Sequence, residues 1–176
     1  TQGADKMKKS IFVLFIISVF LLAACSQTEQ AQQPAQDTQG SYKIGVMAPL
    51  TGDAASVGLP IQKALKIAFD EVNAKGGVNG KKLEPIYEDS KCNPKDGNAA
   101  AQKLISVDNV KVIIGGVCSG ETLGAAPITE ANKVLLISPS ATSPDITKAG
   151  DFVFRTAPSD AYAGAVASDY AFNELN

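Results

Sequence analysis

The sequence predicts an α/β fold in which a parallel sheet is covered by helices on both faces. Three observations support this prediction. Short apolar, β-branched runs alternate with segments of helical spacing along the 176 residues, and the loops between them are short. The most apolar run, at residues 110–115, leads through glycines into a helical segment. Alternation of this kind is typical of βαβ units with right-handed crossovers.

The first half of the predicted sheet begins with a strand at residues 42–49. A helix follows whose apolar residues recur at helical spacing and which ends at a Gly-Gly pair. The residues are Ile61, Leu65, Ala68 and Val72, with Ala64 and Phe69 alongside them, then Gly76 and Gly77. Residues 82–88 form a second strand, whose polar content places it near a sheet edge. Asn93 then caps the next helix, with Pro94 at its first position.

The central strand, residues 110–115, is apolar enough to be buried on both faces of the sheet. A helix over residues 119–132 follows it, and the hydroxyl of Ser119 can cap that helix. The first backbone N–H groups of a helix lack hydrogen-bond partners within the helix, so the turn before this helix is suited to bind a carboxylate. Residues 134–138 form a fourth strand, 144–148 a helical turn and 152–155 a fifth strand.

The last segment, residues 162–176, begins a new amphipathic helix. Its apolar residues lie on or near one face: Tyr162, Val166, Tyr170 and Phe172. No strand follows to pack against it. We therefore expect residues 41–157 to be the first segment of one lobe, and residues 158–176 to be the hinge and the start of a second lobe, in the N-terminal piece of a longer protein.

The N-terminus has the proportions of a secretory signal. Met7, Lys8 and Lys9 are followed by an apolar stretch over residues 11–24, which is shorter than the roughly 20 residues that a membrane-spanning helix needs. Leu22-Ala23-Ala24-Cys25 resembles the bacterial lipobox, which implies cleavage before Cys25 and lipidation of its thiol. The alternative is a plain signal peptide in which Cys25 is incidental. Residues 1–6 precede the first Met, so residues 1–25 are interpreted as an extension plus the signal.

Residues 26–40 hold six Gln and almost no large apolar side chain. Such a segment buries too little surface to order itself and is predicted to be a disordered tether. Fifteen residues of this kind give a root-mean-square reach of roughly 20 Å. A Gln-rich interaction segment is the alternative.

Composition excludes several classes of function. The formal net charge is −2 and no basic patch is present, which argues against nucleic acid as a partner. The sequence contains no His, which removes the usual general base and the commonest metal ligand. We expect no cofactor and no metal.

Two cysteines, Cys92 and Cys118, remain after the signal. An even pair in an exported protein usually forms a disulfide, and we expect their Cα atoms to lie within about 7 Å of each other. A rival interpretation makes residues 116–120 a nucleophile elbow with Cys118 as the nucleophile of an amidase or hydrolase. That site needs a base and a free thiol. We therefore favour a protein that is not an enzyme.

Several motifs together resemble the type I periplasmic binding proteins for branched-chain amino acids. They run in order from residue 42 to residue 164: Tyr42-Lys43-Ile44-Gly45-Val46, Pro49-Leu50-Thr51-Gly52, Asn73 to Gly80, Cys92-Asn93-Pro94, Gly115 to Ser119, and Ser138 to Thr142. The resemblance implies two α/β lobes joined by hinge strands that close on a ligand. With the lipobox it implies an exported, lipid-anchored protein on the periplasmic or cell-surface side, which delivers an amino acid to the membrane permease of an ABC importer.

The resemblance also implies where the ligand binds. Ser119 follows the third strand, and Ser140, Ala141 and Thr142 follow the fourth, where open parallel sheets bind ligands. We predict that Ser119 and Thr142, with nearby backbone N–H groups, hold the ligand carboxylate. The Ser140 carbonyl and the Thr142 hydroxyl are predicted to receive its ammonium. The alternatives are that Ser119 is only a helix cap and that Ser140 and Thr142 are ordinary turn residues.

The resemblance says less about the pocket that would hold the side chain of the ligand. Members that bind amino acids often carry an aromatic residue in the loop after the first strand, where this sequence has Val57 followed by Gly58. Related proteins bind amides, urea or aromatic acids. A ligand-sensing receptor domain of the same fold is therefore the alternative to a transport protein.

Overall fold

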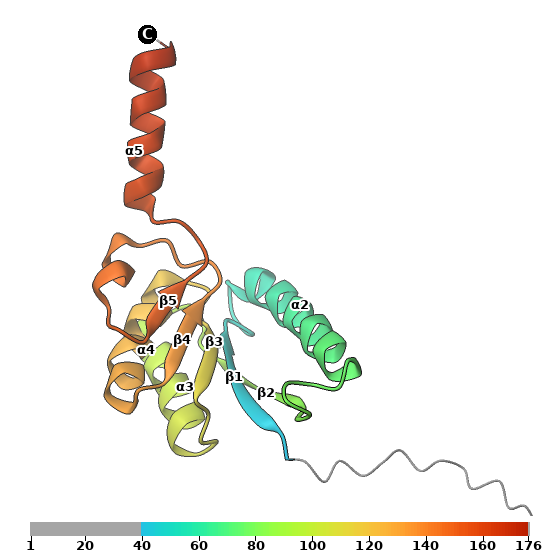
Figure 1. Ribbon diagram of the computed structural model, residues 1–176. Coiled ribbons are helices and arrows are strands. Elements are labelled where there is room, and N and C mark those ends of the chain that lie inside the picture. The colour runs from blue at the N-terminus through green and yellow to red at the C-terminus, as the bar shows by residue number, and fades with distance from the viewer. Residues whose placement is uncertain (1–39, 176) are drawn as a thin grey trace, which may run out of the picture. The chain divides into compact units, whose positions relative to one another are not determined.

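The computed structural model describes residues 40–175, so the signal, Cys25 and residues 26–39 of the tether lie outside the described residues. Five strands form one parallel sheet in the order β2-β1-β3-β4-β5 (Figure 1). Their bounds are β1 (Tyr42–Ala48), β2 (Leu83–Asp89), β3 (Val112–Gly115), β4 (Leu135–Ser138) and β5 (Val153–Arg155). The parallel α/β sheet is confirmed, and so is the edge position of the polar strand β2.

Helices alternate with the strands as the spacing predicted. They are α2 (Ala55–Ala74), α3 (Pro94–Ser106), α4 (Ser119–Asn132) and α5 (Asp160–Tyr170), with a 3₁₀ turn η2 (Pro144–Lys148) and a π-helical turn η3 (Ala171–Leu175). Figure 1 shows α2 on one side of the sheet and α3 with α4 on the other. No helix within residues 40–175 is long and apolar enough to cross a membrane. The same residues contain no cluster of three or more His, Cys, Asp or Glu side chains that could hold a metal ion.

The core lies between the sheet and the pair α3 and α4. Leu104 of α3, Ile113 of β3 and Leu136 of β4 are fully buried there. The two helices come close because α3 carries Gly97 and α4 carries Gly124 at their contact. A Cβ added at Gly124 would lie 2.2 Å from the Pro94 carbonyl oxygen, so only glycine fits this approach.

The opposite face of the sheet is buried less deeply. Val112, Ile114, Leu135 and Ile137 are half-buried, and Phe154 is 52% exposed. The prediction that residues 110–115 are buried on both faces is therefore wrong: Ile113 points into the core, and its neighbours point to the open face. The reason is that α2 packs on β1 and β2, at one end of the sheet.

The apolar residues predicted on or beside the inward face of α2 are buried unevenly. Ala68 is exposed, whereas its neighbour Phe69 is buried. Phe69 lies four residues after Leu65 and eight after Ile61, so all three share one face. The larger Phe side chain removes more apolar surface from water than Ala would, which decides the register.

Candidate ligand-binding site

The loops after β3 and β4 meet at the carboxyl ends of these two neighbouring strands. Three hydrogen bonds join them. The Ser138 hydroxyl donates to the Gly116 carbonyl at 2.6 Å, and the Ser140 hydroxyl donates to the Val117 carbonyl at 2.7 Å. The Ser143 N–H donates to the Ser119 hydroxyl oxygen at 3.1 Å. Ser119 and Ser140, which were predicted from the sequence, are thus held together at the carboxyl ends of the strands.

The loop after β3 is held in place by hydrogen bonds to the side chain of Glu121. This side chain has no solvent exposure, and its carboxylate accepts hydrogen bonds from the backbone N–H groups of Val117 and Cys118 and from the Ser90 hydroxyl. Burial raises the pKa of the Glu121 carboxyl, while these hydrogen bonds pull it down; burial has the larger effect. Glu121 was not among the residues predicted for the site, although a Glu at the third helical position is a capping-box signal.

The cysteine pair lies beside this loop. The sulfurs of Cys92 and Cys118 are bonded in the structure, with their Cα atoms 5.3 Å apart. Cys92 precedes Asn93, whose side chain accepts from the Asp96 N–H and caps α3, so the bridge ties the start of α3 to the start of α4. A bridged Cys118 has no thiol to act as a nucleophile.

Ser119 does not cap its helix. The N-cap of α4 is Cys118, and Ser119 is the first helical residue. Its hydroxyl oxygen accepts from the Ser143 N–H, so the hydroxyl proton remains available for donation. The Ser119 N–H forms no hydrogen bond with any residue among 40–175. Two donors at a helix N-terminus make this position suited to a carboxylate.

Thr142 lies in the loop after β4 and is half-buried. Its hydroxyl donates to an Asp160 carboxylate oxygen at 2.9 Å, and its carbonyl accepts from the Asp160 N–H at 2.9 Å. The Thr142 N–H has no hydrogen-bond partner within the described part of the chain. Asp160 is the first residue of α5, so this loop is attached to the helix that follows the sheet.

The other two residues of the loop play different parts. The Ser140 hydroxyl is used within the protein, and its carbonyl accepts no hydrogen bond from residues 40–175. Ala141 is buried, and its N–H donates to the Ser138 hydroxyl oxygen at 2.9 Å. Ala141 therefore shapes the loop and turns its side chain into the core. Its predicted place as a ligand contact stays a prediction.

Val57 lies in the first turn of α2, whereas the resemblance implied a loop at this position. Its side chain is 52% exposed. The neighbouring Gly58 is buried, and a Cβ there would lie 1.8 Å from the Pro49 carbonyl oxygen. The helix can therefore begin directly against the carboxyl end of β1 only with glycine at this position. No hydrogen bond between described residues links Val57 to the loops after β3 and β4.

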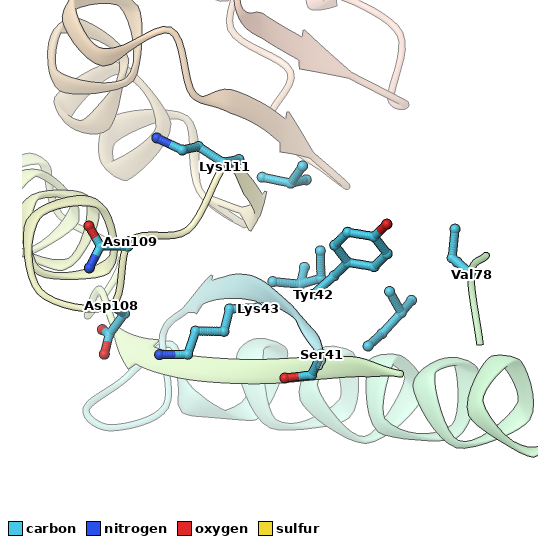
Figure 2. A pocket seen from close by; sticks show the side chains of 10 residues that line it. Ser41, Tyr42, Lys43, Val78, Asp108, Asn109 and Lys111 are labelled. Carbon is cyan, nitrogen blue, oxygen red and sulfur yellow. The ribbon is translucent and has the colours of Figure 1, made fainter. Parts of the chain in front are cut away.

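A cavity of about 640 Å³ opens at the opposite ends of the strands, the amino ends of β1, β2 and β3. Figure 2 shows its lining side chains, among them Tyr42 and Lys43 of β1 and Val78. Because the strands are parallel, these ends lie opposite the ones that carry Ser119 and Thr142. The cavity continues onto the half-buried sheet face through Ile44 and Val112 and is separate from the candidate site.

Known proteins are similar to this chain in sequence and in fold. A family model described as periplasmic binding protein matches residues 41–176. A leucine-, isoleucine-, valine-, threonine- and alanine-binding protein of Pseudomonas aeruginosa is 40% identical over 131 residues, which are 74% of this chain and 35% of that protein. The chain thus spans about a third of the length of the curated relatives it matches.

Solved structures share the fold. A branched-chain amino acid transporter substrate-binding protein from Streptococcus pneumoniae, in complex with isoleucine, has a TM-score of 0.71 and 33% identity over 77% of this chain and 39% of that one. A solute-binding protein of an ABC transporter from Rhodopseudomonas palustris, in complex with 3,4-dihydroxybenzoic acid, has a TM-score of 0.68 and 33% identity, covering 74% and 36%. Proteins of one fold thus hold a zwitterion in one case and an aromatic acid in another.

Proposed function

Because the chain belongs to the periplasmic binding protein family, we propose that it is the substrate-binding component of an ABC importer for amino acids with branched aliphatic side chains. The observation that carries this proposal is a set of polar groups at the carboxyl ends of β3 and β4 that have no hydrogen-bond partner among residues 40–175. They are the hydroxyl proton and N–H of Ser119, the N–H of Thr142 and the carbonyl of Ser140. Donors and acceptors placed on neighbouring loops suit a ligand that carries both charges.

The donors would hold the ligand carboxylate. The Ser119 hydroxyl and the N–H groups of Ser119 and Thr142 each supply a proton, and the positive end of the α4 dipole adds to their attraction. The Ser140 carbonyl and the Thr142 hydroxyl oxygen would receive the ammonium. Hydrogen bonds to charged groups are roughly twice as strong as neutral ones, and more so where water is excluded.

The protein would work outside the cytoplasm. The predicted signal and the lipobox-like residues support export and a lipid anchor at Cys25, and the Gln-rich tether would give the binding lobes room to reach a permease. Relatives of this family are binding proteins. The bonded state of Cys118 supports binding without covalent chemistry.

The experiment is a ligand panel on the chain extended to the full length of its relatives. A ligand that binds only the folded state raises the free energy of unfolding by about 2.7 kcal/mol at a hundredfold excess over Kd, which thermal unfolding detects easily. We expect leucine, isoleucine and valine to raise the melting temperature. The Ser119→Ala, Thr142→Val double variant is the control and should show no rise.

Other outcomes separate the alternatives. A response to 3,4-dihydroxybenzoate or another aromatic acid, without one to amino acids, would keep the binding protein and replace its ligand class. No response to any amino acid, amide, urea or aromatic acid would contradict the proposal. A response that survives in the double variant would show that the ligand binds elsewhere.

A further inference from the structure

Asp160 holds Thr142 through two atoms at once. Its backbone N–H donates to the Thr142 carbonyl at 2.9 Å, and its carboxylate accepts the Thr142 hydroxyl proton, also at 2.9 Å. Asp160 opens α5, whose N-cap is the neighbouring Ser159 with its own hydrogen bond to the Ala161 N–H. The Asp160 side chain is therefore not needed as the helix cap and is directed to Thr142.

This pairing fixes which way the Thr142 hydroxyl can act. A hydroxyl has one proton to donate and two lone pairs to accept with, whereas a carboxylate can only accept. The Thr142 proton is thus committed to Asp160, and its oxygen can only accept from a ligand. Ser119 is arranged in the opposite sense, because its oxygen accepts from the Ser143 N–H and no residue in the described part of the chain takes its proton. Toward a ligand, the Ser119 hydroxyl can therefore donate a hydrogen bond, whereas the Thr142 hydroxyl can only accept one.

Building on the proposed function, we propose that Asp160 is a specificity-determining positioning residue that makes the site require an ammonium group on its ligand. By keeping the Thr142 proton, Asp160 leaves an acceptor where an ammonium donates. It also places a negative charge directly behind that acceptor. A ligand without the ammonium leaves the Thr142 oxygen unpaired when the site closes, which costs affinity because a desolvated acceptor without a donor is unfavourable. Asp160 thus distinguishes an amino acid from a plain carboxylic acid.

The test compares leucine with 4-methylpentanoate, which is leucine with hydrogen in place of the ammonium. Both affinities are measured by calorimetry on the full-length chain, and their ratio is the readout. We expect Asp160→Ala to weaken leucine binding by tenfold or more and 4-methylpentanoate binding by less than threefold, because the freed Thr142 proton can then turn toward the ligand. Asp160→Asn should be intermediate, since its amide oxygen can still accept the proton but carries no full charge.

Two controls keep the test specific. Asp145→Ala removes an exposed carboxylate from η2. Within residues 40–175 the Asp145 side chain makes no hydrogen bond, so this variant should leave the ratio of the two affinities unchanged. In a Thr142→Val background, adding Asp160→Ala should change neither affinity further, because Asp160 acts through the hydroxyl.

The outcomes are distinguishable. A parent protein that does not bind leucine overturns the proposed function and this inference with it. A parent that binds leucine, with an unchanged ratio in Asp160→Ala, overturns the inference alone. Equal weakening of both ligands would also overturn it, because that result means that Asp160 only supports the fold.

Discussion

Glu121 accepts a hydrogen bond from the hydroxyl of Ser90 at a point where neither side chain reaches solvent. The same carboxylate accepts the Cys118 N–H at 3.0 Å. A buried carboxylate is costly unless its oxygens are paired. Here the partners are Ser90, which follows β2, and the Val117 and Cys118 N–H groups of the loop that leads to Ser119. The stability of that loop and the ionisation of Glu121 are therefore linked.

Replacing Glu121 should change how stability depends on pH. Burial, the largest cause, raises the pKa of this carboxyl in the folded state above its ordinary 4.5. Its contribution to stability is fully present below that value and is lost as pH rises through the folded pKa. The free energy of unfolding of the parent should therefore fall relative to Glu121→Gln as the pH rises above 4.5. Urea unfolding across this range measures the difference, and a constant difference would contradict the assignment.

Glu121→Ala should be much worse than Glu121→Gln at every pH. The Gln side chain keeps an oxygen for the N–H groups of Val117 and Cys118, whereas Ala leaves these donors and the Ser90 hydroxyl unpaired. Each unpaired buried group costs about 1–3 kcal/mol, so a loss of at least about 3 kcal/mol is expected. Equal stability of the Ala and Gln variants would show that these hydrogen bonds contribute nothing.

The contact between α3 and α4 should tolerate no side chain at its glycines. A Cβ at Gly97 would lie 2.6 Å from the Glu121 carbonyl oxygen, and one at Gly124 even closer to Pro94. Gly97→Ala and Gly124→Ala should each destabilise the fold by about 1–3 kcal/mol in denaturant unfolding. The matched control is Gly164→Ala in α5, where nothing lies within 4 Å; it should be neutral or stabilise by about 0.5–1 kcal/mol.

Removing the Cys92–Cys118 bridge should destabilise the protein without abolishing its fold. The bridge closes a loop of 26 residues, which on the chain-entropy model contributes about 3 kcal/mol. Cys92→Ala with Cys118→Ala should lower the free energy of unfolding by up to that amount, and a reducing agent should affect the parent but not the variant. Mass spectrometry after alkylation counts the free thiols. Alkylation of both Cys92 and Cys118 in the unreduced, denatured parent would refute the bridge.

Truncating the predicted ligand contacts should weaken binding far more than stability. Thr142→Ala removes the acceptor for the ammonium, and Ser119→Ala removes a donor to the carboxylate; each should cost more than tenfold in affinity, or about 1.4 kcal/mol or more. Ser106→Ala, at an exposed position at the end of α3, is the control. Calorimetry with leucine measures all three. An unchanged affinity in Thr142→Ala would refute its role.

Local signals predicted the fold well. The bounds of α4 match the predicted 119–132, and Asn93 caps α3 as expected, because caps, turns and apolar periodicity act over a few residues. The polar residues of β2 also predicted its edge position. The predicted burial of the central strand on both faces was wrong because burial depends on distant neighbours. How deeply Ile114 is buried depends on which helices cover the sheet, and the sequence of its own strand does not determine this.

The candidate site was predictable only in part. The resemblance led to Ser119 and Thr142, but not to Asp160 or Glu121, which act on them from other elements. Asp160 is 18 residues from Thr142, and nothing in the local pattern marks the pair. Such partners become visible only when the chain is folded, because an exposed helix-starting Asp is ordinary in sequence.

The three serine hydrogen bonds between the loops after β3 and β4 have a thermodynamic consequence. Loops that are already joined lose little conformational freedom when a ligand arrives, so less of the binding free energy is spent on ordering them. This half of the site would thus be preorganised. Most of the entropy change on binding would then come from water release and from movement between lobes, with little from the residues that touch the ligand first.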